Sequence, residues 1–204
     1  PLASEAGAKM LNKGGNAFDA AIATQWALAV VYPQAGNIGG GGFMVANTSN
    51  GEKFTLDYRE TAPEKAHRDM FIINGEAQTE LAQYGALSAG VPGSVAGLYA
   101  TLPYANLPMK TLIQPAIDLA EKGFAITQAE ADLLNRERQK FIEHNIQPTV
   151  FVKNTPWKAG DILIQKDLAK TLRRIQKNGK KEFYEGETAR LIIQEMVKNK
   201  GIIT

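Results

Sequence analysis

The most constraining feature of the chain is a run of four glycines, Gly39–Gly42, followed at once by two short stretches of strand-forming residues. Glycine has no Cβ, so these positions let the backbone approach another strand or a ligand closely. The two stretches, residues 43–47 and 53–58, are separated by Asn50-Gly51. An Asn-Gly pair in this place is typical of a β-hairpin in which both turn residues have positive φ. The sequence therefore predicts an antiparallel hairpin directly after a loop almost free of side-chain bulk.

The residue that follows the second predicted strand is Arg59. A guanidinium fixed at a strand end can bind a carboxylate through two parallel hydrogen bonds, which suits recognition of an amino-acid-like substrate. Its neighbours Asp57 and Glu60 could hold it in place. A structural arginine that only pairs with Asp57 or Glu60 at the rim of the sheet fits the same spacing, and such pairs are commoner than ligand clamps. The residues alone leave both interpretations open.

The longest apolar stretch, residues 17–32, predicts a buried helix. It includes Asp19 and falls short of the roughly 20 residues that a bilayer span needs. Asn16 precedes it as an N-cap, the acid in its first turn suits the helix dipole, and Pro33 ends it. The residues spaced for one core-facing side are Phe18, Ile22, Trp26, Ala29 and Val30.

After the hairpin the chain becomes mainly helical. Amphipathic spacing and helix-end signals predict helices at residues 94–102, 109–122, 127–142, 166–177 and 187–198, with Gly123 as a C-cap. Residues 150–152 resemble a strand. We therefore predict two parts, a sheet-forming part with the core helix and the hairpin at residues 1–107 and a mainly helical part at residues 108–204.

Composition and the remaining motifs argue against several functions. A formal net charge of +2 gives no global nucleic-acid footprint, and the lack of cysteine excludes disulfides and thiolate metal sites. Gly36 and Gly41 have the outer spacing of a phosphate loop, but the Lys and Ser or Thr of such a loop are absent. His67 and His144 lack partners at metal-binding spacing, so no metal is predicted. Basic residues within 166–181 flank an apolar stripe and predict a solvated helix face.

Several motifs follow one another in a specific order. The first three span Gly14–Ala21, Pro33–Met44 and Leu56–Pro63, and the later ones span Ala66–Phe71, Gly90–Gly97, Pro115–Phe124 and Glu182–Gly186. Together they resemble the large subunit of the gamma-glutamyltranspeptidases, also called glutathione hydrolases, over nearly the whole chain. Residues 102–108 depart from the family pattern because a usual glycine is absent there.

The resemblance implies an α+β fold that forms part of an αββα sandwich of the N-terminal-nucleophile hydrolase type. It also implies a reaction in which the γ-glutamyl group of glutathione, or of another γ-glutamyl compound, passes through an acyl-enzyme to water or to an amino acid. Arg59 would be the residue that binds the α-carboxylate of that group. No cofactor is implied.

In this family the nucleophile is a threonine at the N-terminus of a small subunit cut from the same precursor, so no catalytic residue is assigned to this chain. The chain stops before the segment where the family places that threonine, and Thr204 has no free amine with which to replace it. We therefore expect the chain alone to be inactive.

The start of the chain predicts processing or cropping, because residue 1 is Pro1 rather than methionine and no signal segment follows. The resemblance implies a periplasmic or extracellular protein that partners the small subunit. The short apolar stretch and the small net charge predict neither a membrane span nor a nucleic-acid partner.

Two alternative functions remain open. A related acylase that acts on β-lactam side chains would differ mainly in the small subunit. A binding or scaffold fragment would have no catalysis of its own.

Overall fold

The computed structural model describes all residues, 1–204, and its central element is helix α2 (Ala17–Val31). The helix starts where the sequence predicts because Asn16 and Asp19 form a capping box. The Asn16 Oδ1 accepts the backbone N–H of Phe18 at 2.8 Å, and the Asp19 carboxylate accepts the N–H of Asn16 at 2.7 Å. The helix ends just before Pro33, as expected.

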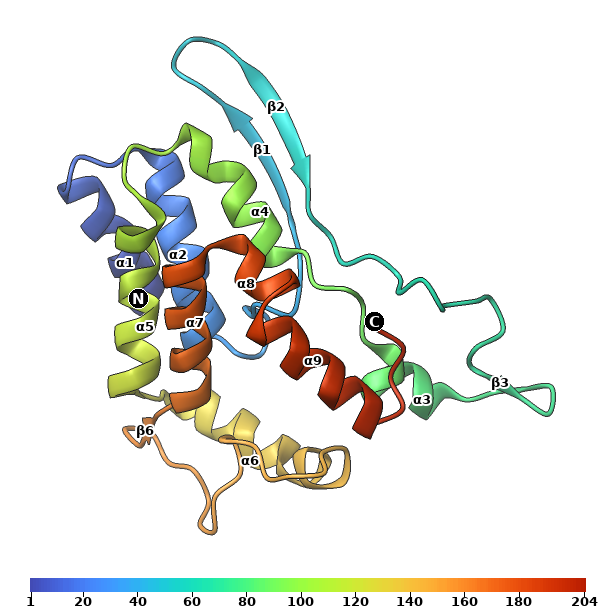
Figure 1. Cartoon of the computed structure of the whole chain (residues 1–204). Helices are drawn as coiled ribbons and strands as arrows, with labels where there is room; N and C mark the ends of the chain where they lie inside the picture. The colour runs from blue at the N-terminus through green and yellow to red at the C-terminus, as the bar shows by residue number, and fades with distance from the viewer.

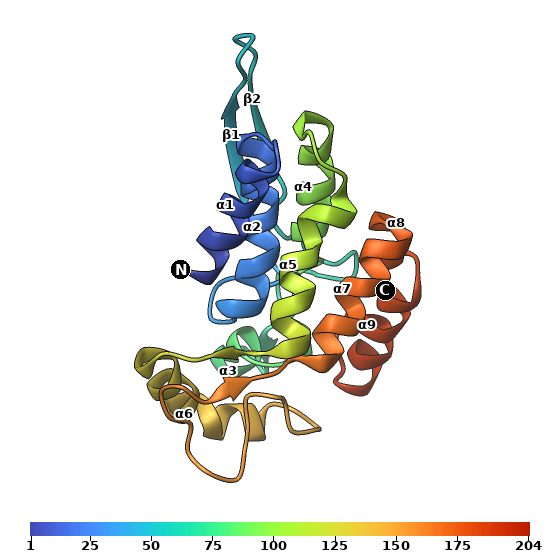
Figure 2. The ribbon, with the colours of Figure 1, turned by 90° about the vertical axis from the view of Figure 1, so that its left-hand side faces the viewer.

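Four helices lie side by side in the order α1 (Leu2–Asn12), α2, α5 (Met109–Lys122) and α7 (Lys166–Asn178), as Figure 2 shows. Trp26 of α2 is fully buried between them, and its Nε1–H contacts the Met109 sulfur at 3.2 Å. The core is one continuous cluster that crosses position 107. The two predicted parts therefore share a core, and their division at residue 107 stays a prediction.

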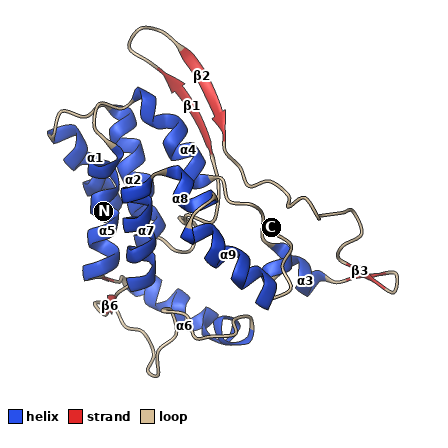
Figure 3. Ribbon diagram, in the orientation of Figure 1, coloured by secondary structure: helices blue, strands red, loops and turns tan.

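The hairpin is formed by β1 (Phe43–Asn47) and β2 (Lys53–Asp57), which pair antiparallel and extend beyond the helices (Figures 1 and 3). The predicted turn is wrong in one respect, because Gly51 has a φ of 86° while Asn50 has a negative φ. The Gly51 N–H donates to the Thr48 carbonyl at 3.0 Å. The connection is therefore a type I turn closed by a left-handed glycine rather than a two-residue type I′ turn.

The inner face of the hairpin packs on aromatic rings. Phe54 stacks on Tyr104 at a centroid distance of 4.4 Å, and Phe18 of α2 lies 6.1 Å from Phe54. Phe18 is half-buried in this cluster rather than placed in the main core as predicted, because the hairpin supplies its partners. On the outer face, Phe43 is 64% and Val45 85% exposed.

The predicted helices of the second half are present. They are α4 (Ser94–Thr101), continued by the 3-10 turn η2 (Leu102–Tyr104), then α5, α6 (Gln128–Glu143), α7 and α9 (Glu187–Lys198). Gly123 caps α5 with a φ of 81°. No helix combines the length and the apolar character that crossing a bilayer requires.

The predicted strand at residues 150–152 is wrong, because this segment is a turn. The Phe151 carbonyl accepts the indole N–H of Trp157 at 2.8 Å rather than a strand partner. Short elements without a readable periodicity also escaped prediction: β3 (Ile72–Ile73), β4 (Glu76–Ala77), α3 (Thr79–Gln83), η1 (Ala86–Ser88), β5 (Phe124–Ala125), β6 (Ile162–Leu163) and α8 (Lys180–Tyr184).

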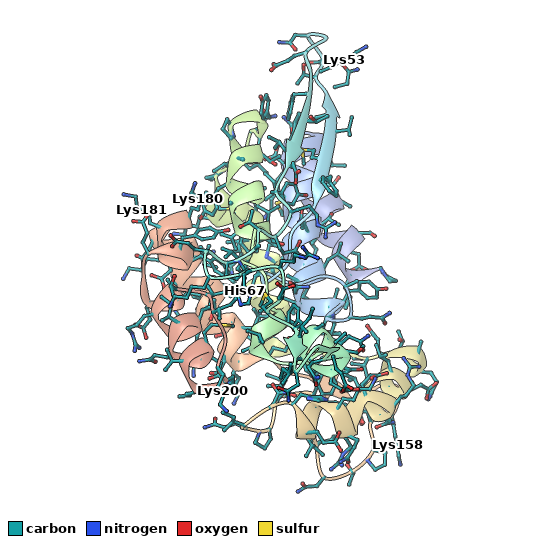
Figure 4. The ribbon with its side chains drawn as sticks, turned by 90° about the vertical axis from the view of Figure 1, so that its right-hand side faces the viewer. Lys53, His67, Lys158, Lys180, Lys181 and Lys200 are labelled. Atoms are coloured by element: carbon teal, nitrogen blue, oxygen red, sulfur yellow. The ribbon has the colours of Figure 1, made fainter.

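The basic segment is only partly a solvated face. Lys180 and Lys181 point away from the molecule (Figure 4), but Arg174 turns inward and its Nε donates to the Glu182 carboxylate at 3.0 Å. Glu182 is 6% exposed and also accepts the Thr188 N–H and hydroxyl. Burial by itself raises the pKa of Glu182, but the hydrogen bonds from Thr188 and from its other donors outweigh burial and leave this pKa below its ordinary value.

We expect Glu182→Gln to destabilise the protein at neutral pH, because a neutral amide oxygen accepts the hydrogen bonds from Arg174 and Thr188 more weakly than a carboxylate does. A loss of about 2 kcal/mol corresponds to a decrease in Tm of roughly 5 °C. Because the pKa of Glu182 is lower in the folded than in the unfolded protein, the stabilisation is complete above the unfolded pKa and is lost as the pH falls through the folded pKa.

The difference in Tm between Glu182→Gln and the unsubstituted protein should therefore shrink between pH 7 and pH 3 in thermal melts. Exposed Glu185→Gln is the control, and a constant difference across this pH range would contradict the assignment.

Candidate functional site

Arg59 lies just beyond the end of β2, with its side chain 62% exposed. Its backbone N–H donates to the Asp57 carboxylate at 3.0 Å, and its Nε donates to Glu60 Oε2 at 3.2 Å. The two terminal nitrogens, Nη1 and Nη2, have no hydrogen-bond partner in the chain. Asp57 therefore fixes the backbone, Glu60 orients the guanidinium, and the outer fork of Arg59 stays available.

The guanidinium also lies against an aromatic ring. The Arg59 Cζ is 5.6 Å from the centroid of Phe43, the first residue of β1. An exposed cation–π contact of this kind contributes about 0.5–1 kcal/mol and restricts the arginine to one side of the strand. Sequence reasoning missed Phe43, although an aromatic residue directly after the glycines was the available signal.

The glycine loop packs against the chain on either side of Arg59. A Cβ added to Gly41 would lie 2.5 Å from the Tyr58 carbonyl oxygen and 2.8 Å from the Arg59 Cα. The loop therefore approaches the end of β2 and not the end of α2. The glycine that contacts α2 closely is Gly36, whose Cβ would lie 2.5 Å from the Leu28 carbonyl oxygen.

The same loop holds the start of α4. The Gly40 carbonyl accepts the N–H groups of Gly93 and Ser94 at 2.8 and 2.9 Å, and so satisfies two donors at the amino end of the helix. A Cβ on Gly93 would lie 1.9 Å from the Tyr58 carbonyl oxygen. The segment that carries Arg59 is therefore enclosed between the glycine loop and the first turn of α4.

A cleft of about 560 Å³ opens between α2 and the glycine loop. Its polar lining comes from Thr24, Gln25, Asn37, Glu60 and Ser94. Phe43 and Glu60, which both contact Arg59, line the cleft, whereas Arg59 itself is not among its lining residues. The arrangement combines a positive fork with a polar hollow beside it, which suits a ligand that carries a carboxylate.

The two histidines lie apart from this cleft. Neither is among its lining residues, and His144 stacks on Tyr84 at a centroid distance of 4.5 Å.

Comparison with known proteins identifies the family. A family model described as Gamma-glutamyltranspeptidase matches residues 3–204. The chain belongs to the gamma-glutamyltranspeptidase family. The glutathione hydrolase proenzyme of Escherichia coli (strain K12) is 44% identical over 206 residues, which cover 99% of this chain and 36% of that protein. The chain thus spans about a third of the length of this curated relative.

Solved structures show the same relationship. The gamma-glutamyltranspeptidase of Helicobacter pylori superposes with a TM-score of 0.97 at 50% identity, covering all of this chain and 60% of that one. The cephalosporin acylase of Bacillus halodurans superposes at 0.86 and 27% identity, covering all of this chain and 39% of that one. These likenesses confirm the predicted fold, α+β and part of the architecture of N-terminal-nucleophile hydrolases.

We expect Gly41→Ala to destabilise the protein, because the added methyl group would overlap backbone atoms of Tyr58 and Arg59 that cannot move independently. Overpacking of this kind costs about 1–3 kcal/mol. Gly39→Ala is a matched control, since its nearest neighbour would be at an ordinary 3.5 Å. Thermal melts should show a lower Tm for Gly41→Ala only. Equal melting temperatures with a selective loss of ligand binding would assign Gly41 to the ligand instead.

Proposed function

We propose that this chain forms the carboxylate-binding part of an enzyme that hydrolyses or transfers the γ-glutamyl group of glutathione and related γ-glutamyl amides. Family membership supports the reaction class. The observation that carries the proposal is Arg59, whose outer nitrogens are free while its Nε is held by Glu60, a residue that lines the cleft. The α-carboxylate of the γ-glutamyl group would accept two parallel hydrogen bonds from this fork.

The remaining chemistry would come from polypeptide outside these residues. In the proposed reaction, the hydroxyl of an N-terminal threonine attacks the γ-glutamyl amide carbon, and its own amine takes the proton and returns it to the leaving amine. Water or an amino acid then attacks the acyl-enzyme, which releases the γ-glutamyl group and restores the threonine. The partner of this chain would be the small subunit of the same precursor, and the family resemblance supports a periplasmic or extracellular location.

A second candidate is an acylase acting on β-lactam side chains. The superposition on the cephalosporin acylase favours it at 27% identity, and the higher identity of 50% to a gamma-glutamyltranspeptidase favours the first proposal. Parallel assays of the full-length protein with a γ-glutamyl anilide and a cephalosporin side-chain amide would separate the two. Activity on neither substrate would favour the scaffold function.

In the full-length protein, Arg59→Lys is expected to raise KM for a γ-glutamyl anilide with little change in kcat, because an ammonium cannot form the bidentate pair. A loss of about 1.5–3 kcal/mol corresponds to roughly a ten- to hundredfold decrease in kcat/KM. Arg68→Lys is the control, since Arg68 is 95% exposed and pairs only loosely with Asp69. Unchanged kinetics of Arg59→Lys would refute the assignment.

The purified chain of residues 1–204 is expected not to hydrolyse a γ-glutamyl anilide, because the proposed nucleophile lies elsewhere. Co-expression with the remaining part of the precursor should restore turnover. Turnover by residues 1–204 alone that disappears in Arg59→Ala would show that the nucleophile is in this chain, and would contradict the proposed division of chemistry.

A further inference from the structure

Tyr184 joins two distant parts of the chain through its hydroxyl group. The hydroxyl donates to the Pro92 carbonyl at 2.9 Å and accepts the backbone N–H of Ala96 at 3.0 Å. Both partners belong to the first turn of α4 or to the residues just before it. The hydroxyl therefore fixes this turn from the side of α8.

The turn that Tyr184 holds is the one that encloses Arg59. It contains Gly93, which lies directly against the Tyr58 carbonyl, and it donates two N–H groups to Gly40. On the other side of the turn, Val91 pairs with Thr61 through two backbone hydrogen bonds. A small displacement of this turn would therefore be transmitted by direct backbone contact to the residues on both sides of Arg59.

Tyr184 is itself held firmly. The preceding residues, Glu182 and Phe183, are 6% and 3% exposed, and Glu182 is bonded to α7 through Arg174 and to α9 through Thr188. Burial raises the pKa of Tyr184 despite the hydrogen bond from Ala96. The phenol thus keeps its proton at physiological pH and can donate to Pro92 throughout.

We propose that Tyr184 is a positioning residue for Arg59, acting through the first turn of α4. It holds the backbone that carries the guanidinium in place without touching the ligand. This role rests on the proposed function, because it requires that Arg59 binds the substrate carboxylate.

The chain offers a matched control in Tyr99. This tyrosine is also half-buried and also joins α4 to the C-terminal helices, through a hydrogen bond from its hydroxyl to the Ile175 carbonyl at 3.2 Å. Its hydroxyl makes no hydrogen bond to the first turn of α4 or to the segment that carries Arg59. A Tyr→Phe change at either position removes one hydroxyl that joins α4 to the C-terminal helices, but only the change at Tyr184 removes a hydrogen bond to the turn beside Arg59.

The test compares Tyr184→Phe and Tyr99→Phe in the full-length protein with a γ-glutamyl anilide. Both changes should lower Tm by a few degrees, which is the effect of about one lost hydrogen bond. Tyr184→Phe should also raise KM by about three- to tenfold, on the order of that same bond, with kcat changed less than about twofold. Tyr99→Phe should leave KM unchanged. Measuring the kinetics well below each Tm excludes unfolding as the cause.

A double-mutant cycle with Arg59→Lys tests whether the effect passes through the arginine. The increase in KM caused by Tyr184→Phe should be largely absent in the Arg59→Lys background. Equal increases in both backgrounds, or equal KM values for Tyr184→Phe and Tyr99→Phe, would refute the positioning role while the proposed function stands. Unchanged KM in Arg59→Lys alone would refute the proposed function, and the positioning role with it.

Discussion

The strand end that carries Arg59 depends on two backbone contacts that leave no room for a Cβ. Gly41 lies against the Arg59 Cα on one side, and Gly93 lies against the Tyr58 carbonyl on the other. Neither contact can relax by rotating a side chain, because every atom involved belongs to the main chain. The strand end is therefore held by packing from both sides, and the position of the Arg59 backbone does not depend on what its guanidinium binds.

The magnitudes of the interactions explain why this arrangement suits ligand binding. The Arg59–Glu60 ion pair is exposed, and such pairs contribute about 0–1 kcal/mol, whereas overpacking a close backbone contact costs about 1–3 kcal/mol. The ion pair therefore holds the guanidinium only weakly, while a change at the backbone contact is costly. Glu60 can orient the guanidinium through Nε, yet it competes only weakly with a carboxylate that meets both Nη1 and Nη2.

Local sequence patterns predicted those features that depend on residues close together in the chain. Periodicity located the long helices, the Asn16 cap located the start of α2, and strand alternation placed Arg59 at the end of β2. Contacts between residues far apart in the sequence leave no such pattern. The approach of Gly93 to Tyr58, the inward turn of Arg174 and the bond from Tyr184 to Pro92 each required the structure. The missed strands have two residues each, which is too short for a period to be read.

The hairpin links the proposed binding site to the proposed partner. An isolated two-stranded hairpin is marginal in water, and here the aromatic cluster on its inner face stabilises it. Its outer face leaves Val45 85% exposed, and Phe43 and Arg59 lie on this same face. A subunit that covers Val45 would therefore also approach the guanidinium. On the proposed function, covering Phe43 and Val45 and bringing the nucleophile toward the bound carboxylate are one event, so assembly and completion of the active site would be coupled by geometry.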